Sequence, residues 1–106
     1  MSFNSDIAAV PTLLLDDDVA RMTRWDFAPG AATGWHTHES PYFIVLLTDA
    51  VLRIHDGKNV SETQMSAGHS YRRPAGVKHD VMNGGDIAMA FVEIEVKRPD
   101  LLVMAK

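Results

Sequence analysis

Residues 68–83, GHSYRRPAGVKHDVMN, hold the most informative pattern in this chain. Its turn-forming and polar residues have the spacing Gly-x5-Pro-x-Gly-x2-His-x3-Asn. The marked positions are Gly68, Pro74, Gly76, His79 and Asn83. Glycine and proline interrupt strand pairing and make corners, because glycine allows positive φ and proline lacks a backbone donor. The pattern therefore predicts two short strands joined by a turn, with His79 on the second strand.

A second histidine pattern, His36-Thr37-His38, lies earlier in the chain. Residues two apart on a strand face the same side, with Cα atoms about 6.6 Å apart, so both imidazoles project from one face. His79, on a neighbouring strand, would add a third imidazole. Three such ligands suit a divalent transition metal, and the ligand set alone leaves iron, nickel, zinc, manganese and copper open.

The two patterns together resemble the two motifs of the cupin superfamily. Gly30-x5-His36-x-His38 is similar to the first half of motif one, and residues 68–83 match motif two at every marked position. The resemblance covers about 19–96 and implies an all-β double-stranded β-helix, or jelly-roll barrel, with a metal held by the three histidines. It also implies a small single-domain cupin spanning 1–106, whose core at 19–96 is extended by an N-terminal strand at 12–15.

Motif one is incomplete in this chain. The family usually places a glutamate ligand four or five residues after the second histidine, where this sequence has Tyr42 or Phe43. Glu39 follows His38 directly and is expected to face the other way. Tyr42 keeps the parity of the histidines and is the tentative catalytic residue, as a proton donor or as a hydrogen-bonding group that orients the ligand. Without a carboxylate ligand the ion keeps its full charge, which favours an anionic small molecule.

Short β-type segments separated by turn residues recur along the chain. They are expected at 12–15, 19–27, 42–47, 51–55, 58–65, 70–73, 77–82 and 87–96, with a last helical turn at 99–105. Such spacing predicts an all-β sandwich or barrel. Asp56-Gly57 predicts a type I′ hairpin turn. The segment 87–96 is apolar on both faces, so we expect a second subunit to cover one of them in a homodimer.

Composition excludes several classes of protein. The chain has 106 residues, which is room for one domain, and 10 basic against 14 acidic residues give a net charge of −4, which disfavours a nucleic-acid partner. It has no cysteine, so disulfides and thiolate catalysis are excluded. No signal peptide and no apolar run of about 20 residues is evident, so we expect a cytoplasmic protein without a membrane partner.

Other polar and aromatic residues are assigned mainly structural positions. Glu93 shares a strand face with Phe91 and would serve as acid, base or missing ligand if it pointed inward, but exposure at the strand end is the favoured interpretation. Trp25 and Trp35 are expected in the core, with Trp35 as a possible wall of the pocket because it precedes His36. The remaining polar groups are expected in solvent, with substrate binding as the alternative for the arginines: Asp16–Asp18, His55, His69, Arg72 and Arg73.

The sequence thus predicts a metal-binding cupin that binds, and as an enzyme would convert, a small organic molecule, with a carboxylate favoured. As an enzyme it would be metal-dependent and dioxygenase-like, or isomerase- or decarboxylase-like. Two other classes stay open: a non-catalytic ligand-binding or sensor protein, and a structural protein with a relict site. The fold alone does not decide among them.

Overall fold

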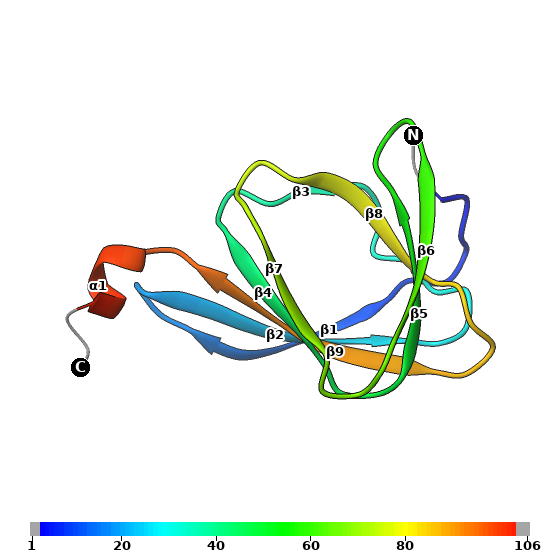
Figure 1. Ribbon diagram of the computed structural model, residues 1–106, viewed down its shortest axis with the longest axis horizontal. Coiled ribbons are helices and arrows are strands. Elements are labelled where there is room, and N and C mark those ends of the chain that lie inside the picture. Colours follow the sequence, from blue (N-terminus) through cyan, green and yellow to red (C-terminus); the bar gives the residue numbers. More distant parts are fainter. Residues whose placement is uncertain (1–2, 104–106) are drawn as a thin grey trace.

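The computed structural model describes residues 3–103, which form nine strands and one short helix (Figure 1). In chain order these are β1 (Val10–Asp16), β2 (Ala20–Phe27), β3 (His36–Thr37), β4 (Tyr42–Leu46), β5 (Ala50–His55), β6 (Val60–Met65), β7 (Ser70–Arg73), β8 (Lys78–Asn83), β9 (Met89–Val96) and α1 (Pro99–Val103). The predicted last turn at 99–105 corresponds to α1, and its final two positions lie outside the described residues. No helix within residues 3–103 is long and apolar enough to cross a membrane.

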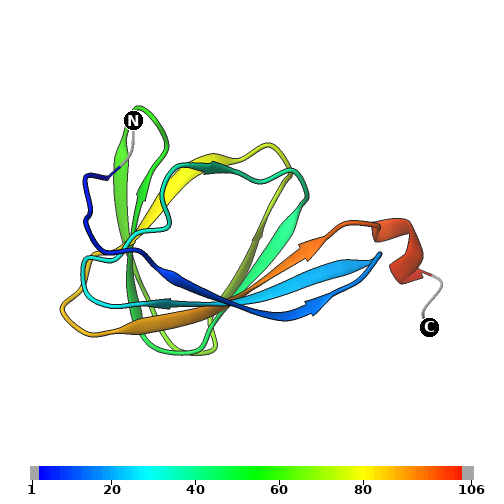
Figure 2. The same cartoon turned by 180° about the vertical axis from the view of Figure 1, so that it is seen from behind.

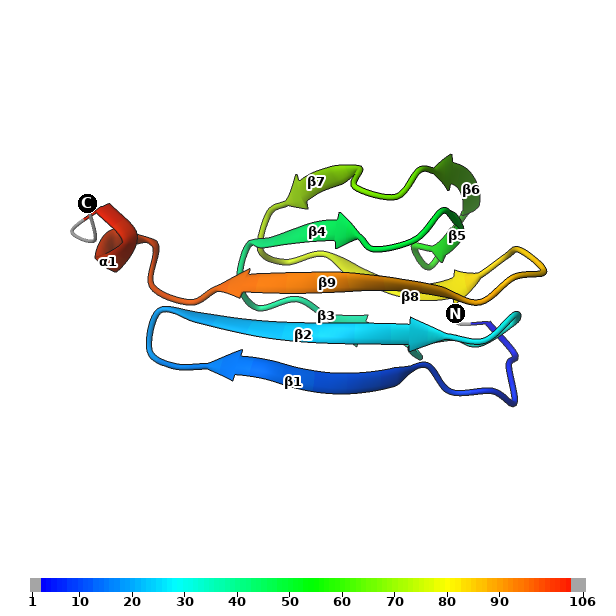
Figure 3. The ribbon, with the colours of Figure 1, turned by 90° about the horizontal axis from the view of Figure 1, so that it is seen from below.

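The strands form two antiparallel sheets that face each other. One sheet has the order β1-β2-β9-β4-β7 and the other has the order β3-β8-β5-β6. Figure 2 shows from behind that β1, β2 and β9 lie on one side of the barrel and β8 (yellow) on the other. In Figure 3, β2 and β9 run on past the barrel towards α1. This arrangement confirms the all-β jelly-roll prediction.

The core lies between the sheets and follows strand alternation. In β4, Tyr42, Ile44 and Leu46 are buried while Phe43 is exposed, as period-two packing requires. Phe27 of β2 and Phe91 of β9 meet across the core with ring centroids 5.3 Å apart. The inner face of β4 therefore continues from core packing at Leu46 to the site region at Tyr42.

The fixed residues of the second motif build corners that position the histidines. Gly76 has a φ of 94°, which glycine adopts without a steric penalty, and its N–H donates to the His38 carbonyl at 2.7 Å. Asn83 is buried, and its Nδ2 donates to the carbonyls of Phe27 and Ile87 while its Oδ1 accepts from the Gly85 N–H. These bonds tie the β7–β8 turn and the end of β8 to neighbouring segments.

The hairpin between β5 and β6 differs from the prediction. Gly57 has a φ of 100°, but among residues 3–103 every positive φ belongs to a glycine, so Asp56 cannot take the first central position of a type I′ turn. The connection is instead a four-residue loop, 56–59, because His55 pairs with Val60. The Asp56 carboxylate accepts the N–H groups of Lys58 and Asn59 and stabilises this longer loop.

The first strand is longer and more exposed than the predicted segment 12–15. β1 is an edge strand of the five-stranded sheet, every one of its residues is exposed, and its pairing with β2 shifts register between Leu13 and Leu15. Its apolar residues include Val10 at 58% and Leu13 at 60% exposure. The strand therefore adds a hydrophobic outer surface rather than core.

Candidate metal centre

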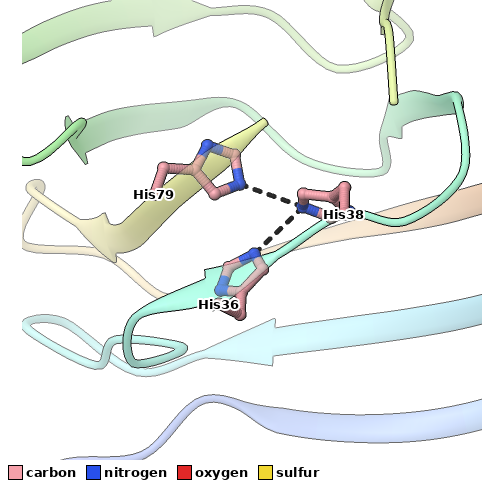
Figure 4. Close-up of side chains that lie close together, drawn as sticks. All are labelled: His36, His38 and His79. Atoms are coloured by element: carbon pink, nitrogen blue, oxygen red, sulfur yellow. Dashed lines mark hydrogen bonds between the residues drawn. The ribbon is translucent and has the colours of Figure 1, made fainter. Parts of the chain in front are cut away.

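Three histidine rings converge at one end of the space between the sheets. His36 on β3 pairs directly with His79 on β8, and His38 follows β3. The Nε2 atom of His38 lies 3.0 Å from Nε2 of His36 and 3.0 Å from Nε2 of His79 (Figure 4). The structure thus brings together all three histidines predicted from the sequence, each with a ring nitrogen within 4.8 Å of the others.

His36 is held in the tautomer that a metal ligand needs. Its Nδ1 lies 2.8 Å from the Gly34 carbonyl oxygen, which can only accept a hydrogen bond, so Nδ1 carries the hydrogen. The lone pair of Nε2 is then free and points at the other two rings. A hydrogen bond from the outer ring nitrogen to a carbonyl is the usual way in which proteins orient metal-binding histidines.

His38 is fixed by its backbone and by an aromatic ring. Its N–H donates to the Val77 carbonyl at 2.8 Å, and its carbonyl accepts from Gly76 at 2.7 Å. The Tyr42 ring stacks on the imidazole, with ring centroids 3.8 Å apart and an interplanar angle of 21°. The side chain is 5% exposed in the folded protein, so few other ring orientations are open to it.

Burial keeps two of the rings neutral. It lowers the pKa of His38 to about 4, with His36 as the next contribution, and it lowers the pKa of His79 to about 3, again followed by His36. Both imidazoles are therefore uncharged at neutral pH and carry free lone pairs. Protonated rings would repel a cation, so these shifts favour metal binding.

The distances fit a divalent transition metal. Ring nitrogens bind such ions at about 2.0–2.1 Å, so two of them at right angles around one ion lie about 3 Å apart. The two measured Nε2 separations of 3.0 Å agree with that spacing. Neutral imidazole is a good ligand for iron, nickel, copper and zinc.

The histidines line a pocket of about 540 Å³ between the sheets. Aromatic and acidic side chains form much of the remaining wall, and they include Trp25, Tyr42, Tyr71, Phe91, Glu93 and Glu95. Trp35 is absent from this lining and instead packs edge-on against His55, with ring centroids 6.5 Å apart. The expectation that Trp35 could wall the pocket is therefore wrong, and Trp25 of β2 has that place.

Glu93 points into the pocket rather than into solvent. It is 8% exposed, and its Oε2 lies 3.9 Å from Nε2 of His38. Burial, followed by the neighbouring Glu95, raises the pKa of Glu93 to about 7. The expectation of exposure at the strand end is wrong, because Glu93 faces His38 across the pocket. Glu39 also lines the pocket but is exposed. A carboxylate thus approaches His38 from β9, the strand beside β4.

One buried residue of the site region was missed by sequence reasoning. Asp80 is 0% exposed, and its carboxylate accepts the Gly34 N–H at 3.0 Å and the Phe3 N–H at 2.9 Å. It therefore holds the loop whose carbonyl orients His36. A charged residue inside the strand segment KHDVMN was the available signal, because a carboxylate is buried only when it has partners.

The other histidines and the two arginines considered in the sequence analysis lie outside the pocket lining. His69, Arg72 and Arg73 are exposed, as expected. His55 is half-buried and contacts the Phe3 ring, with centroids 5.7 Å apart, so its side chain is only partly solvated. Its Nδ1 accepts the Gly57 N–H, which gives His55 a role in the β5–β6 loop.

Comparisons with known proteins agree with this architecture. The family model described as a cupin domain matches residues 23–95. Beta-alanine degradation protein BauB of Pseudomonas aeruginosa is 42% identical over 89 residues, which cover 84% of this chain and 94% of that protein. A cupin domain crystal structure from Bordetella pertussis Tohama I has a TM-score of 0.82 and 40% identity, with 86% of this chain and 95% of that chain covered. A Klebsiella pneumoniae protein with a double-stranded β-helix domain, 20% identical and with a TM-score of 0.72 over 91% of this chain and 83% of that chain, shares the fold.

Proposed function

The chain belongs to the cupin domain family, and from that premise we propose that it binds a divalent transition metal and, on it, a small organic acid. The observation that supports this most directly is the convergence of three Nε2 atoms with separations of 3.0 Å about His38. His36, His38 and His79 are the proposed ligands. Iron, nickel, zinc and copper suit imidazole ligands, and manganese, which prefers oxygen ligands, completes the set of metals to test.

A metal held only by neutral rings would attract an anion. When bound, it supplies a Lewis-acidic centre with positions left for an exogenous ligand. None of the three proposed ligands is a carboxylate, so the protein gives the ion no negative charge by direct coordination, although Glu93 lies close to His38. A carboxylate-bearing small molecule is therefore the favoured ligand, and the pocket of about 540 Å³ has room for one.

We propose that Tyr42 orients the metal centre by stacking on the His38 ring. Burial raises the pKa of its phenol well above the ordinary value, so the hydroxyl stays protonated at neutral pH. The side chain therefore acts through ring stacking on His38 and as a neutral hydrogen-bonding group towards the ligand. If the bound acid is converted, the reaction is metal-dependent, and a dioxygenase-, isomerase- or decarboxylase-like step is proposed.

The name of the Pseudomonas relative narrows the choice of acids to test. That protein is named for the degradation of β-alanine, and this chain covers 94% of its length. We propose that this chain binds a carboxylic acid of a similar size to β-alanine, with a few carbons.

A homodimer is the proposed assembly. Four apolar side chains of the edge strand β1 are 44–60% exposed, namely Val10, Leu13, Leu14 and Leu15. A strand edge with exposed apolar residues is a template for pairing with another chain. We propose that a second copy of this protein covers these side chains of β1.

Ligand binding by the metal-loaded protein tests the functional proposal. Short carboxylic acids are titrated into protein loaded with each metal, by calorimetry, while product formation and dioxygen consumption are followed. We expect binding that is lost in His38→Ala and retained in His69→Ala, whose ring is exposed. Equal binding by metal-loaded and metal-free protein would contradict the proposal.

A further inference from the structure

The pocket has a second wall whose chemistry differs from that of the histidines. Glu93 and Glu95 are two residues apart on β9, so both face inward, and both line the pocket together with Trp25 of β2. We refer to Glu93, Glu95 and Trp25 as the acidic wall. We infer that the acidic wall binds a cationic nitrogen of the ligand, so that the site takes short amino acids in preference to plain carboxylic acids.

The acidic wall lacks a committed cation of its own. Within residues 3–103, neither Glu93 nor Glu95 forms an ion pair with a lysine or an arginine. Two cations, Arg21 and Lys97, also line the pocket, but each forms an ion pair with Asp16, which is exposed. Arg21 pairs with Glu95 in the β2–β9 register and attracts it, so Glu93 is the less compensated of the two carboxylates.

Burial of Glu93 without such a partner is unfavourable for the free protein. Glu93 is buried, with 8% of the residue and 11% of its side chain exposed, and a second carboxylate, that of Glu95, lies beside it on the same strand face. Buried carboxylates are normally paired, because removing the charge from water is otherwise costly. A positively charged ligand nitrogen would offset the cost of burying the Glu93 carboxylate. It would also reduce the repulsion between Glu93 and Glu95.

Aromatic residues complete the recognition of a cation. Trp25 belongs to the acidic wall, and Tyr71 lines the same pocket and is half-buried. Aromatic faces attract ammonium groups, and tryptophan does so most strongly. A pocket wall that combines carboxylates with indole and phenol rings is therefore better suited to an amine than to a second anion.

The position of Glu93 sets the size of the ligand. Its Oε2 is 3.9 Å from Nε2 of His38, so the acidic wall begins beside the proposed metal ligands. A carboxylate at the histidines and an amine at Glu93 would belong to one short molecule. This inference rests on the proposed function, which supplies the site for the carboxylate end, and it adds the class of ligand.

Matched pairs of ligands test the inference. Metal-loaded protein is titrated by calorimetry with ω-amino acids of two to five carbons and with the corresponding unsubstituted acids, and metal content is measured in the same samples. We expect at least one amino acid to bind tenfold or more tightly than its unsubstituted partner. Glu93→Gln should abolish this preference and keep the metal, and Glu95→Gln should reduce it. Glu62→Gln is the control, because Glu62 is exposed on β6 and pairs with Arg53.

The outcomes separate this inference from the function on which it rests. Equal binding of amino acids and plain acids by the wild type overturns the inference and leaves the proposed function standing. A preference that survives in folded, metal-containing Glu93→Gln also overturns it. If metal-loaded wild-type protein binds neither amino acids nor plain acids, both the inference and the proposed function are contradicted. The comparison within the wild type needs no variant, so it decides even if Glu93→Gln does not fold.

Discussion

Tyr42 lies face to face with His38, with ring centroids 3.8 Å apart and ring planes inclined by 21°. Here an aromatic ring supports the histidine, and the nearby carboxylate comes from Glu93, on the strand paired with β4. At this position the chain therefore supports His38 by packing, and the acidic group beside His38 comes from the neighbouring strand β9.

Truncation of Tyr42 should damage the centre through packing. Tyr42→Ala removes a side chain that is 2% exposed, and the cavity should lower the free energy of unfolding by about 3–5 kcal/mol. Tyr42→Phe keeps the ring and should lower it by less than about 1.5 kcal/mol. Urea unfolding and metal titration of both variants measure the difference. Equal damage in the two variants would show that the hydroxyl, and not the stacked ring, supports His38.

Removal of the Asp80 carboxylate should loosen the loop that orients His36. Asp80→Ala leaves the Gly34 and Phe3 N–H groups without their acceptor, which should lower the free energy of unfolding by about 2–5 kcal/mol. Metal affinity should fall about tenfold or more, because groups behind the ligands set their orientation. Asp86→Ala, at an exposed position between β8 and β9, is the control. Unchanged metal affinity in a folded Asp80→Ala protein would refute this role.

Acid should destabilise the metal-free protein. The pKa values of His38 and His79 are about 4 and 3 in the folded state against 6.5 for the ordinary group, so below pH 6.5 the unfolded chain binds protons that the folded chain does not. Glu93 acts in the opposite sense, because its folded pKa of about 7 exceeds the ordinary 4.5. One net proton remains on the unfolded side.

The free energy of unfolding should therefore fall as the pH is lowered from about 6 to about 4.5, by up to about 1.4 kcal/mol per pH unit. Urea unfolding of chelator-treated protein across this range measures the slope. A protein that gains stability on acidification over the same range would show that the histidines are not buried as neutral rings.

A charge on β1 should break the proposed homodimer. Leu13 is 60% exposed, so Leu13→Glu should leave the fold of one chain intact and prevent a second copy from covering the strand. Sedimentation should then report a monomer. Ile87→Glu, at a side chain that is 78% exposed in the loop before β9, should leave the dimer unchanged. A wild-type protein that sediments as a monomer at micromolar concentration would contradict the proposal.

Local patterns, together with their resemblance to the two cupin motifs, predicted the fold and the three-histidine cluster. Strand parity places His36 and His38 on one side, and the glycine and asparagine positions of residues 68–83 make the corners that bring His79 to them. Parity could also have corrected one expectation. Trp35 directly precedes His36, so alternation along an extended strand would turn it away from the histidine pocket, and in the structure it packs against His55.

Other features depend on contacts between distant segments. Alternation along β9 left open whether Glu93 faces the pocket or the solvent. The sequence did not show that Glu93 would lie opposite His38. Asp80 is buried by Gly34 and Phe3, which are far from it in the sequence. Trp25 reaches the pocket because β2 pairs with β9, and these two strands are far apart in the sequence.

Metal content tests the central claim most directly. Protein reconstituted separately with iron, nickel, zinc, manganese and copper, and then desalted, is measured by elemental analysis. We predict about one ion per chain for at least one metal, loss of that ion in the double variant His36→Ala, His79→Ala, and full retention in His69→Ala. Wild-type protein that retains none of these metals, or a double variant that retains as much as the wild type, would contradict the assignment of the three histidines as a metal centre.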